Sequence, residues 1–256
     1  MMKKATLPIG VFDSGVGGIS VLRELMALMP NENYIFFGDS ANAPYGTKTL
    51  DEVVKLTCKD AAYLYEQGVK AIVVACNTAT SAGVKILRER YTDIPVIGIE
   101  PALKPAVLSA KHPTVLVMAT PMTLREEKFQ NLMHRYEQDA EIIPLPCPGL
   151  VEFIERGELE SEELEHFLRK LFAPYKKADA VVLGCTHYPF AKKMIEKILG
   201  EEVLLFDGGA GTARETKRKL EEFELVNPSP EKGKVVILNS AKNPEMIALC
   251  ERLLYL

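Results

Sequence analysis

Two cysteines, Cys76 and Cys185, stand where a thiol could do acid–base chemistry. Each follows a short apolar run and precedes a segment of helical period, which predicts a place at the end of a buried strand and just before a helix. The helix dipole at such a place lowers the pKa of a thiol. A single free cysteine is usually a small buried hydrophobic residue, but two at equivalent places in two similar halves indicate function.

Two thiols that face one cleft could invert a carbon stereocentre. This reaction needs a base on one face of the carbon and an acid on the other, and a thiolate and a thiol that exchange roles would serve both directions. Each thiol then needs a neighbour that tunes its proton affinity, and Asp13 could do this for Cys76 and His187 for Cys185. A lone histidine is more often structural, but its place beside Cys185 and Thr186 favours a functional role.

Small polar residues and glycines gather at the predicted strand ends, where open parallel sheets bind their ligands. They are Asp13–Gly18, Asn77–Thr78, Thr120 and Thr186. Glycines let backbone N–H groups approach a ligand and helix N-termini favour anions, so a carboxylate suits this edge. The glycine loop alone is not specific and fits an ordinary tight turn, because it lacks both dinucleotide-binding spacing and the Lys-Ser/Thr of a P-loop.

Short apolar runs that alternate with helical segments predict an α/β protein with open parallel sheets. The expected strands are Ile9–Asp13, Tyr34–Asp39, Ala71–Cys76, Pro95–Glu100, Thr114–Ala119, Ala140–Leu145, Ala180–Cys185, Val203–Asp207 and Lys234–Asn239. Helix-start signals are the capping boxes Thr49–Glu52, whose helix should stop at Gly68, and Thr123–Glu126, and the N-cap pair Asn243-Pro244.

The first eight expected strands form two sets of four that match in order and in approximate offset, which predicts two similar α/β domains related by pseudo-twofold symmetry. The active site is expected in the cleft between them. The ninth strand and last helix should return to the first domain. We therefore expect a first domain of residues 1–100 plus 213–256, on the Cys76 side, and a second of residues 101–212, on the Cys185 side.

The composition excludes several classes of protein. The chain has 256 residues, 47% of them hydrophobic and 26% charged, as is ordinary for globular domains. Thirty-one basic against 35 acidic side chains leave no excess to bind nucleic acid, and no apolar run is long enough for a membrane span. No signal peptide is recognisable, and the five cysteines are odd in number and scattered, so we expect a cytoplasmic protein without a disulfide framework.

Four motifs together resemble the glutamate racemases of the aspartate/glutamate racemase superfamily. They are Phe12-Asp13-Ser14-Gly15-Val16-Gly17-Gly18, Pro44-Tyr45-Gly46, Ala75-Cys76-Asn77-Thr78-Ala79 and Gly184-Cys185-Thr186-His187-Tyr188-Pro189. The resemblance spans most of the chain in family order. It implies an enzyme that interconverts L- and D-glutamate and supplies D-glutamate for peptidoglycan, that needs neither a metal nor pyridoxal phosphate, and that is commonly a homodimer.

The resemblance also implies roles for single residues. Cys76 and Cys185 would be the two acid/base groups, each acting on one enantiomer, with Asp13, His187 and Glu155 assisting. The implied substrate contacts are Asp13, Ser14, Tyr45, Gly46, Asn77, Thr78, Thr120, Thr123, Thr186 and His187.

Some positions depart from the family pattern. Ala119 stands where Gly is common, Glu126 and Gly208 where Ser is usual, and Glu152 where Pro is frequent. With two glutamates three positions apart, either Glu152 or Glu155 could be the assisting acid. The departures bear on substrate binding more than on the reaction, because none touches the cysteine motifs.

Other interpretations stay open from the residues alone. A cysteine hydrolase or isomerase would use Cys185 as nucleophile and His187 as base, and would leave Cys76 unexplained. A non-catalytic binder could hold a solute between two α/β halves. Zinc ligation by Cys185 and His187 is less favoured because only one half offers such a pair. Cys58 and Cys250 are expected in helix packing, and Cys147 has no assigned role.

Overall fold

Two parallel sheets organise the chain, which a computed structural model describes for residues 2–175 and 177–256. The first sheet has the strand order β4-β3-β1-β2-β9 and the second the order β6-β5-β7-β8, and every strand pair is parallel. The strands are β1 Ile9–Asp13, β2 Tyr34–Gly38, β3 Ala71–Val74, β4 Val96–Gly98, β5 Thr114–Ala119, β6 Glu141–Pro146, β7 Ala180–Leu183, β8 Leu204–Asp207 and β9 Val235–Asn239. The predicted α/β class with parallel sheets is confirmed.

Helices connect the strands and cover the sheets, because parallel strands need long crossover connections. The α-helices are α1 Met2–Ala5, α2 Ile19–Leu28, α3 Leu50–Glu66, α4 Asn77–Arg90, α5 Leu103–Val107, α6 Pro121–Arg125, α7 Glu127–His134, α8 Leu150–Glu155, α9 Glu162–Phe172, α10 Lys192–Leu199, α11 Gly209–Glu222 and α12 Pro244–Leu254. Three 3₁₀ turns are η1 Ser40–Asn42, η2 Tyr45–Thr47 and η3 Tyr188–Ala191.

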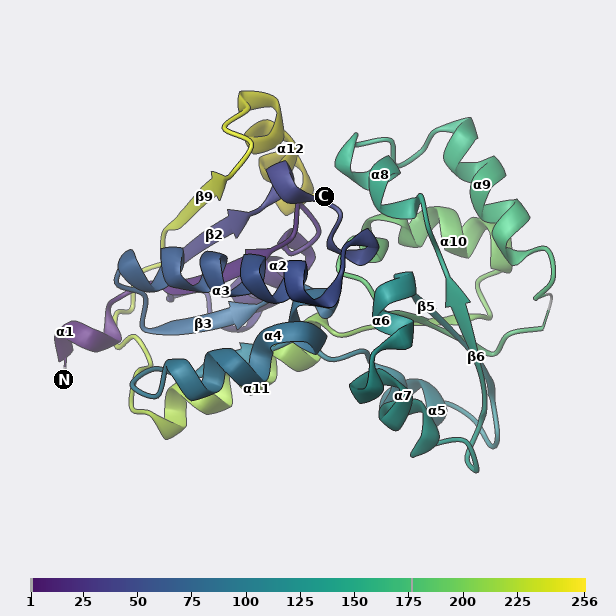
Figure 1. Ribbon diagram of the computed structural model, residues 1–256, viewed down its shortest axis with the longest axis horizontal. Helices are drawn as coiled ribbons and strands as arrows, with labels where there is room; N and C mark the ends of the chain where they lie inside the picture. The colour runs from purple at the N-terminus through teal and green to yellow at the C-terminus, as the bar shows by residue number, and fades with distance from the viewer. Residues whose placement is uncertain (1, 176) are drawn as a thin grey trace.

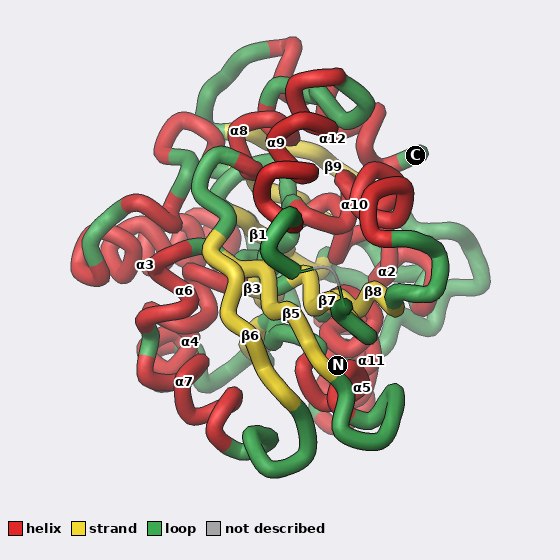
Figure 2. The backbone as a smooth tube through the Cα atoms, turned by 90° about the vertical axis from the view of Figure 1, so that its right-hand side faces the viewer, coloured by secondary structure: helices red, strands yellow, loops and turns green. Residues whose placement is uncertain are grey.

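The two sheets form two lobes that lie side by side (Figure 1). One lobe holds the sheet of β1–β4 and β9, and the other holds β5–β8 with helices α5 to α10 (Figures 1 and 2). Helix α11 follows β8 in the chain but packs against α2 in the first lobe, and β9 then pairs with β2. The chain therefore crosses between the lobes twice, after β4 and after β8.

The central strands are apolar along their whole length because both faces of each sheet are covered. All four residues of β3 and all four of β7 are buried. Such continuous apolar runs are typical of parallel sheets, in contrast to the alternation of half-exposed antiparallel strands.

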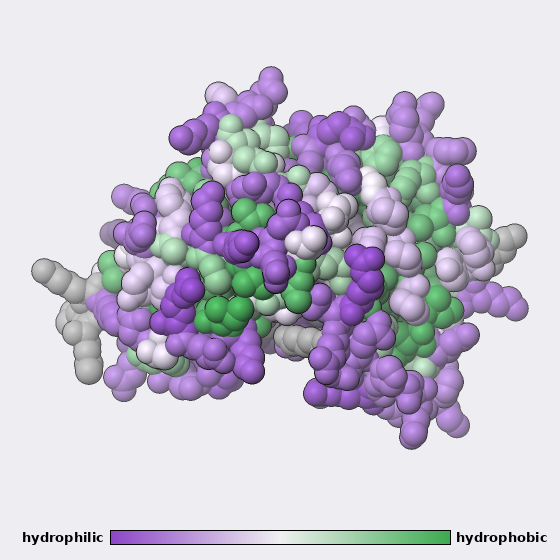
Figure 3. Space-filling model, viewed as in Figure 1, coloured by the Kyte–Doolittle hydropathy of each residue, from purple (hydrophilic) through white to green (hydrophobic). Residues whose placement is uncertain are grey.

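The face of the molecule seen in Figure 3 is mostly hydrophilic, with hydrophobic side chains in smaller areas. Within the described residues, no helix is both long and apolar enough to cross a membrane.

Two of the three helix-start predictions are confirmed. Thr49 caps α3 in a complete capping box with Glu52, and Gly68, with φ +75°, follows the helix end. Asn243 caps α12 with Pro244 at the first helical position. The capping box at Thr123 was wrong: Thr120 caps α6 by accepting a hydrogen bond from the Thr123 N–H, and α7 starts separately after Glu126.

Four predicted strands are shorter than expected at their carboxyl ends: β2 stops at Gly38, one residue early, and three others stop two residues early. β3 stops at Val74, β7 at Leu183 and β4 at Gly98, so Cys76 and Cys185 lie just beyond the sheets and not in their last positions. The pairing of β3 with both of its neighbours ends at Val74, and the pairing of β7 with both of its neighbours ends at Leu183. The two thiols are thereby released from the sheet faces into the space between the lobes.

Candidate active site

Cys76 begins helix α4 and is 5% exposed. As the N-cap residue, its sulfur accepts a hydrogen bond from the Ala79 N–H at 3.4 Å and donates one to the Ser14 hydroxyl at 3.5 Å. Ser14 belongs to the glycine loop after β1, so two strand ends of the first lobe meet at this thiol. The predicted place of Cys76 directly before a helix is confirmed.

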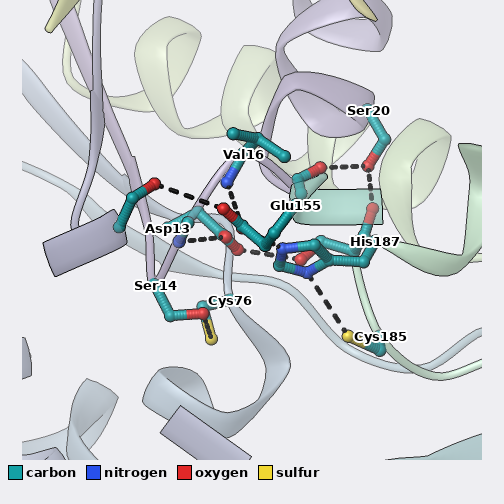
Figure 4. A network of polar contacts seen from close by, with 12 residues as sticks. Asp13, Ser14, Val16, Ser20, Cys76, Glu155, Cys185 and His187 are labelled. Carbon is teal, nitrogen blue, oxygen red and sulfur yellow. Dashed lines mark hydrogen bonds and ion pairs between the residues drawn. The ribbon is translucent and has the colours of Figure 1, made fainter. Parts of the chain in front are cut away.

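Cys185 lies on the second lobe, 8% exposed, with its sulfur 3.7 Å from Nδ1 of His187 (Figure 4). Its surroundings differ from those of Cys76, because the 3₁₀ turn η3 separates it from α10, which starts only at Lys192. The expected place just before an α-helix was therefore wrong for Cys185. A histidine, and not a helix N-terminus, is the polar group that faces this thiol.

Glu155 connects the two lobes at this histidine. Its Oε1 lies 2.6 Å from Nε2 of His187 and accepts a hydrogen bond from the Val16 N–H at 2.7 Å (Figure 4). The glycine loop makes room for this contact, since a Cβ at Gly15 would lie 1.8 Å from Glu155 Oε1. Glycine is needed here by close approach, and its position in the sequence gives no sign of that.

Asp13 is fully buried at the end of β1 and makes the second connection between the lobes. Its Oδ1 accepts the Gly15 N–H at 2.8 Å, and its Oδ2 accepts the Thr186 hydroxyl at 2.8 Å. Ser20 adds a third, because its hydroxyl lies 2.8 Å from the Thr186 carbonyl oxygen. Asp13 precedes Ser14, which contacts Cys76, and Thr186 follows Cys185. The hydrogen bond between Asp13 and Thr186 therefore connects the surroundings of the two cysteines.

Burial dominates the electrostatics of the first thiol. Desolvation, and then the negative charge of Asp13, raise the pKa of Cys76 to about 12. The Ala79 N–H and the Ser14 hydroxyl act in the opposite direction but are weaker. The expectation that the helix dipole leaves this thiol with a lowered pKa was wrong for the closed site, because exclusion of water from a thiolate outweighs one turn of a helix.

His187 is buried and charged. Burial alone would lower its pKa, but hydrogen bonds to Cys185 and Glu155 and their negative charges outweigh that effect, and the pKa lies well above its usual value. The imidazolium therefore directs one N–H to the Cys185 sulfur and the other to Glu155. Asp13 has a raised pKa because burial outweighs the charge of His187 and its hydrogen bonds.

Three threonine hydroxyls form a buried triangle between the lobes. Thr78 Oγ1 lies 3.2 Å from those of Thr120 and Thr123, which are 2.9 Å apart. Beside them Asn77 is 4% exposed, and its Oδ1 is a buried acceptor with no hydrogen-bond partner among the described residues. Three hydroxyl donors and one open acceptor suit a zwitterionic ligand that carries carboxylate and ammonium groups.

Tyr45 and Gly46 approach this triangle through η2. A Cβ at Gly46 would lie 2.6 Å from Cβ of Thr120, so the backbone here runs directly against the second lobe. The Tyr45 hydroxyl points away into the first lobe, where it lies 2.7 Å from both Asp39 and Asp60. Any substrate contact of Tyr45 must then come from its main chain.

Sequence reasoning missed Asp39 and Asp60. Asp60 had one available signal, because it falls on the buried stripe of α3 with Val53, Thr57, Ala61 and Leu64. A charged residue on an apolar stripe needs a partner.

The geometry also separates the two glutamates of α8: Glu155 contacts His187, while Glu152, one turn earlier, is half-buried without a contact to it.

The other three cysteines lie outside the polar network, and Gly208, which departs from the family pattern, is explained by packing. Cys250 is buried in α12, Cys58 is half-buried in α3, and the Cys147 thiol lies buried 3.2 Å from the Leu145 carbonyl. Gly208 is required by packing, since a Cβ there would lie 2.3 Å from the Glu100 carbonyl oxygen. Across the described residues, no group of three or more His, Cys, Asp or Glu side chains is arranged to hold a metal ion.

Comparison with known proteins agrees with this geometry. The family described as Asp/Glu/Hydantoin racemase matches residues 10–216. The chain belongs to this family. Among curated relatives, the glutamate racemase of Clostridium acetobutylicum is 55% identical over 249 residues, 96% of this chain and 97% of that protein. The glutamate racemase of Clostridium perfringens is 53% identical over 249 residues, 96% of each.

Solved structures show the same arrangement. The crystal structure of glutamate racemase from Francisella tularensis in complex with D-glutamate has a TM-score of 0.84 and 33% identity, covering 98% of this chain and 95% of that one. The aspartate racemase of Picrophilus torridus, at 14% identity and a TM-score of 0.60, shares the fold alone.

Proposed function

We propose that this protein is a glutamate racemase that interconverts L- and D-glutamate, with Cys76 and Cys185 as its two acid/base groups. The observation that carries the proposal is the pair of buried thiols on opposite lobes, each with its own polar partner in one connected network. The family membership and the glutamate racemases at 53–55% identity support the substrate.

The two thiols have different polar partners. The raised pKa of Cys76 keeps it a thiol, ready to donate a proton, while the His187 imidazolium faces the Cys185 sulfur at 3.7 Å. In one direction Cys185 removes the α-proton and Cys76 delivers a proton to the opposite face. The reverse direction uses the same groups with exchanged roles, so the chain's own side chains supply both the base and the acid.

Substrate recognition would use the polar groups between the lobes. Thr78, Thr120 and Thr123 offer hydroxyl donors to a carboxylate, and Asn77 Oδ1 offers an acceptor to the ammonium group. Gly46 beside Thr120, Ser14 beside Cys76 and Thr186 beside Asp13 complete the proposed contacts. Closure of the lobes around the substrate excludes water from the carbanion-like transition state.

The same proposal covers the domains, the cellular location, the oligomeric state and the physiological role of the protein. The domains are residues 1–100 plus 213–256 and residues 101–212, in keeping with the strands of each sheet. The five free cysteines suit a reducing compartment, which supports a cytoplasmic location. We further infer a homodimer and a role in supplying D-glutamate for peptidoglycan, both on the family resemblance; sedimentation equilibrium tests the first, and D-glutamate auxotrophy of a deletion strain the second.

Proton NMR in D₂O tests the reaction directly. The wild-type protein should remove the α-proton signal of both enantiomers, and Cys76→Ala and Cys185→Ala should each slow racemisation by roughly 10²–10⁴-fold, the usual loss for an acid/base group. Cys58→Ala, which removes a thiol outside the site, is the matched control and should match the wild type. Full racemisation by either active-site variant, or a covalent adduct on Cys185 without α-proton exchange, would contradict the proposal.

A further inference from the structure

A buried tyrosine hydroxyl lies between two buried carboxyl groups in the first lobe. The hydroxyl of Tyr45 is 2.7 Å from Oδ2 of Asp39, which follows β2, and 2.7 Å from Oδ2 of Asp60, in α3. The three residues are 1%, 1% and 2% exposed. None of the proposed catalytic steps uses either carboxyl group, so the cluster needs a separate explanation.

The two short contacts of the Tyr45 hydroxyl require two protons. A phenol has one hydrogen and can donate it to one carboxylate only. The second contact of 2.7 Å is then a hydrogen bond only if that carboxyl is itself protonated and donates to the phenol oxygen. One proton must therefore reside on the Asp39–Asp60 pair in addition to the hydroxyl proton of Tyr45.

The surroundings indicate which carboxyl holds the proton. The Asn42 side-chain amide lies 3.0 Å from both Asp39 oxygens, so Asp39 is placed to accept as a carboxylate. Among the described residues Asp60 has no such amide donor, and burial, followed by the charge of Asp39, raises the pKa of Asp60 to about 7. The order is then a protonated Asp60 donating to Tyr45, which in turn donates to Asp39.

The tyrosine held by these hydrogen bonds is next in the chain to the proposed substrate site. Tyr45 starts the turn η2, and its neighbour Gly46 runs against Thr120, one of the three hydroxyls between the lobes. The aromatic ring itself is packed in the apolar core with Val53 and Met122. Fixing the hydroxyl therefore fixes the direction in which the Tyr45–Gly46 peptide meets the cleft.

We propose that Asp60 is a positioning residue: together with Asp39 it clamps the Tyr45 hydroxyl through one shared proton and so holds the Tyr45–Gly46 peptide at the substrate site. The inference rests on the proposed racemase function and adds to it a group that touches no substrate. We name Asp39, Tyr45 and Asp60 the carboxyl clamp.

The clamp predicts a pH dependence with a definite sign. The charged and titratable groups that act on Asp60 are Asp39 and Tyr45 in the clamp, Asp13 at the end of β1, and the exposed Lys59 on its own helix. Below about pH 7 Asp60 keeps its proton and the clamp is complete. Above it, two carboxylates face a hydroxyl that can serve only one, so KM for glutamate should rise while kcat changes less.

Carbon NMR of the substrate-free protein tests the shared proton without any assay of activity. With ¹³C-labelled aspartate, the Asp60 side-chain carboxyl should titrate near pH 7, and Asp60→Asn should identify its signal by deleting it. A carboxyl that is already ionised at pH 5 would overturn the clamp. Because no substrate is present, this result is separate from the outcome for racemisation.

Kinetics of matched variants test the positioning role. Asp60→Asn keeps a donor to Tyr45 at every pH, so it should retain the wild-type KM at pH 6.5 and lose the rise of KM above about pH 7. Tyr45→Phe should raise KM about tenfold, as for one lost hydrogen bond, with kcat reduced less. Asp51→Asn, at the exposed start of the same helix, is the control and should keep the wild-type pH profile.

Two results would contradict the inference. One is an Asp60→Asn protein whose KM rises with pH as steeply as that of the wild type. The other is a Tyr45→Phe protein that folds and keeps the wild-type KM. If Tyr45→Phe does not fold, the pH profile of Asp60→Asn and the carbon titration still decide the question.

Discussion

At the scale of single residues, the most informative feature is the hydrogen-bonded line Cys185–His187–Glu155. The two ring nitrogens of His187 face the sulfur at 3.7 Å and the carboxylate at 2.6 Å. A buried histidine normally loses its charge, and the hydrogen bonds to these two partners, with their negative charges, keep the pKa of this one high. The charge of His187, which faces the Cys185 thiol, therefore depends on a glutamate of α8 that does not contact that thiol.

Glu155→Gln should move the alkaline limit of activity to lower pH. The glutamine removes a charge-assisted hydrogen bond and a negative charge, so the pKa of His187 falls and the imidazolium is lost earlier as pH rises. The measurement is kcat/KM from pH 6 to pH 10. Glu152→Gln, on the same helix and also half-buried, is the matched control. An unchanged alkaline limit in Glu155→Gln would show that Glu155 does not set the charge of His187.

At the scale of elements, the glycine loop after β1 and the loop after β7 are fitted together by contact. A Cβ at Gly17 would lie 2.3 Å from Nδ1 of His187, and one at Gly15 would meet Glu155. The glycines thus allow the first lobe to approach His187 and Glu155 of the second. Anion binding by backbone N–H groups, expected from sequence, is partly realised within the protein itself, because Val16 donates to Glu155.

Gly17→Ala should therefore damage catalysis far more than folding. The added methyl group must displace the His187 ring, so we expect kcat to fall about 100-fold, with an overpacking cost of about 1–3 kcal/mol in the free energy of unfolding. Gly211→Ala in α11 is the control: its nearest neighbour would be 3.9 Å away, and a helical alanine should add up to about 1 kcal/mol of stability with unchanged activity. Rate assays and urea unfolding measure both, and wild-type activity in Gly17→Ala would contradict the predicted contact.

At the scale of the whole molecule, both proposed acid/base thiols are buried between lobes that touch. Hydrogen bonds join Asp13 to Thr186 and Val16 to Glu155 across the interface between the lobes. Cys76 is 5% exposed and Cys185 is 8% exposed. A substrate can reach such a site only if the lobes separate. The two crossings after β4 and β8 are the covalent connections about which they would move.

Alkylation should report this motion. Iodoacetamide should modify Cys76 and Cys185 slowly in the free protein and at least about tenfold more slowly with saturating D-glutamate, because a bound ligand holds the lobes closed. Mass spectrometry of the peptides gives each rate separately. The half-buried Cys58 serves as the internal control and should react equally with and without ligand. Equal protection of all three thiols, or of none, would contradict closure around the two active-site cysteines.

The sequence by itself determined the fold class, the nine strands and the presence of one cysteine after a strand in each of the two similar halves. These follow from local patterns: apolar runs, capping residues such as Thr49 and Asn243, and motifs at strand ends. It also placed Asp13 and Cys76 at the carboxyl end of one sheet and Cys185 and His187 at that of the other, because ligands of open parallel sheets bind beyond those ends. Local competition explains the helix start that was wrong, since Thr120 followed by Pro121 is a better start than Thr123.

Only the tertiary structure decided how these groups act on one another. Glu152 and Glu155 occupy adjacent turns of one short helix, and their spacing could not say which meets His187. The pKa of Cys76 rises because burial depends on what the other lobe places over it, which local sequence does not encode. Asp39, Tyr45 and Asp60 come from three separate elements, so their shared proton exists only once those elements have packed.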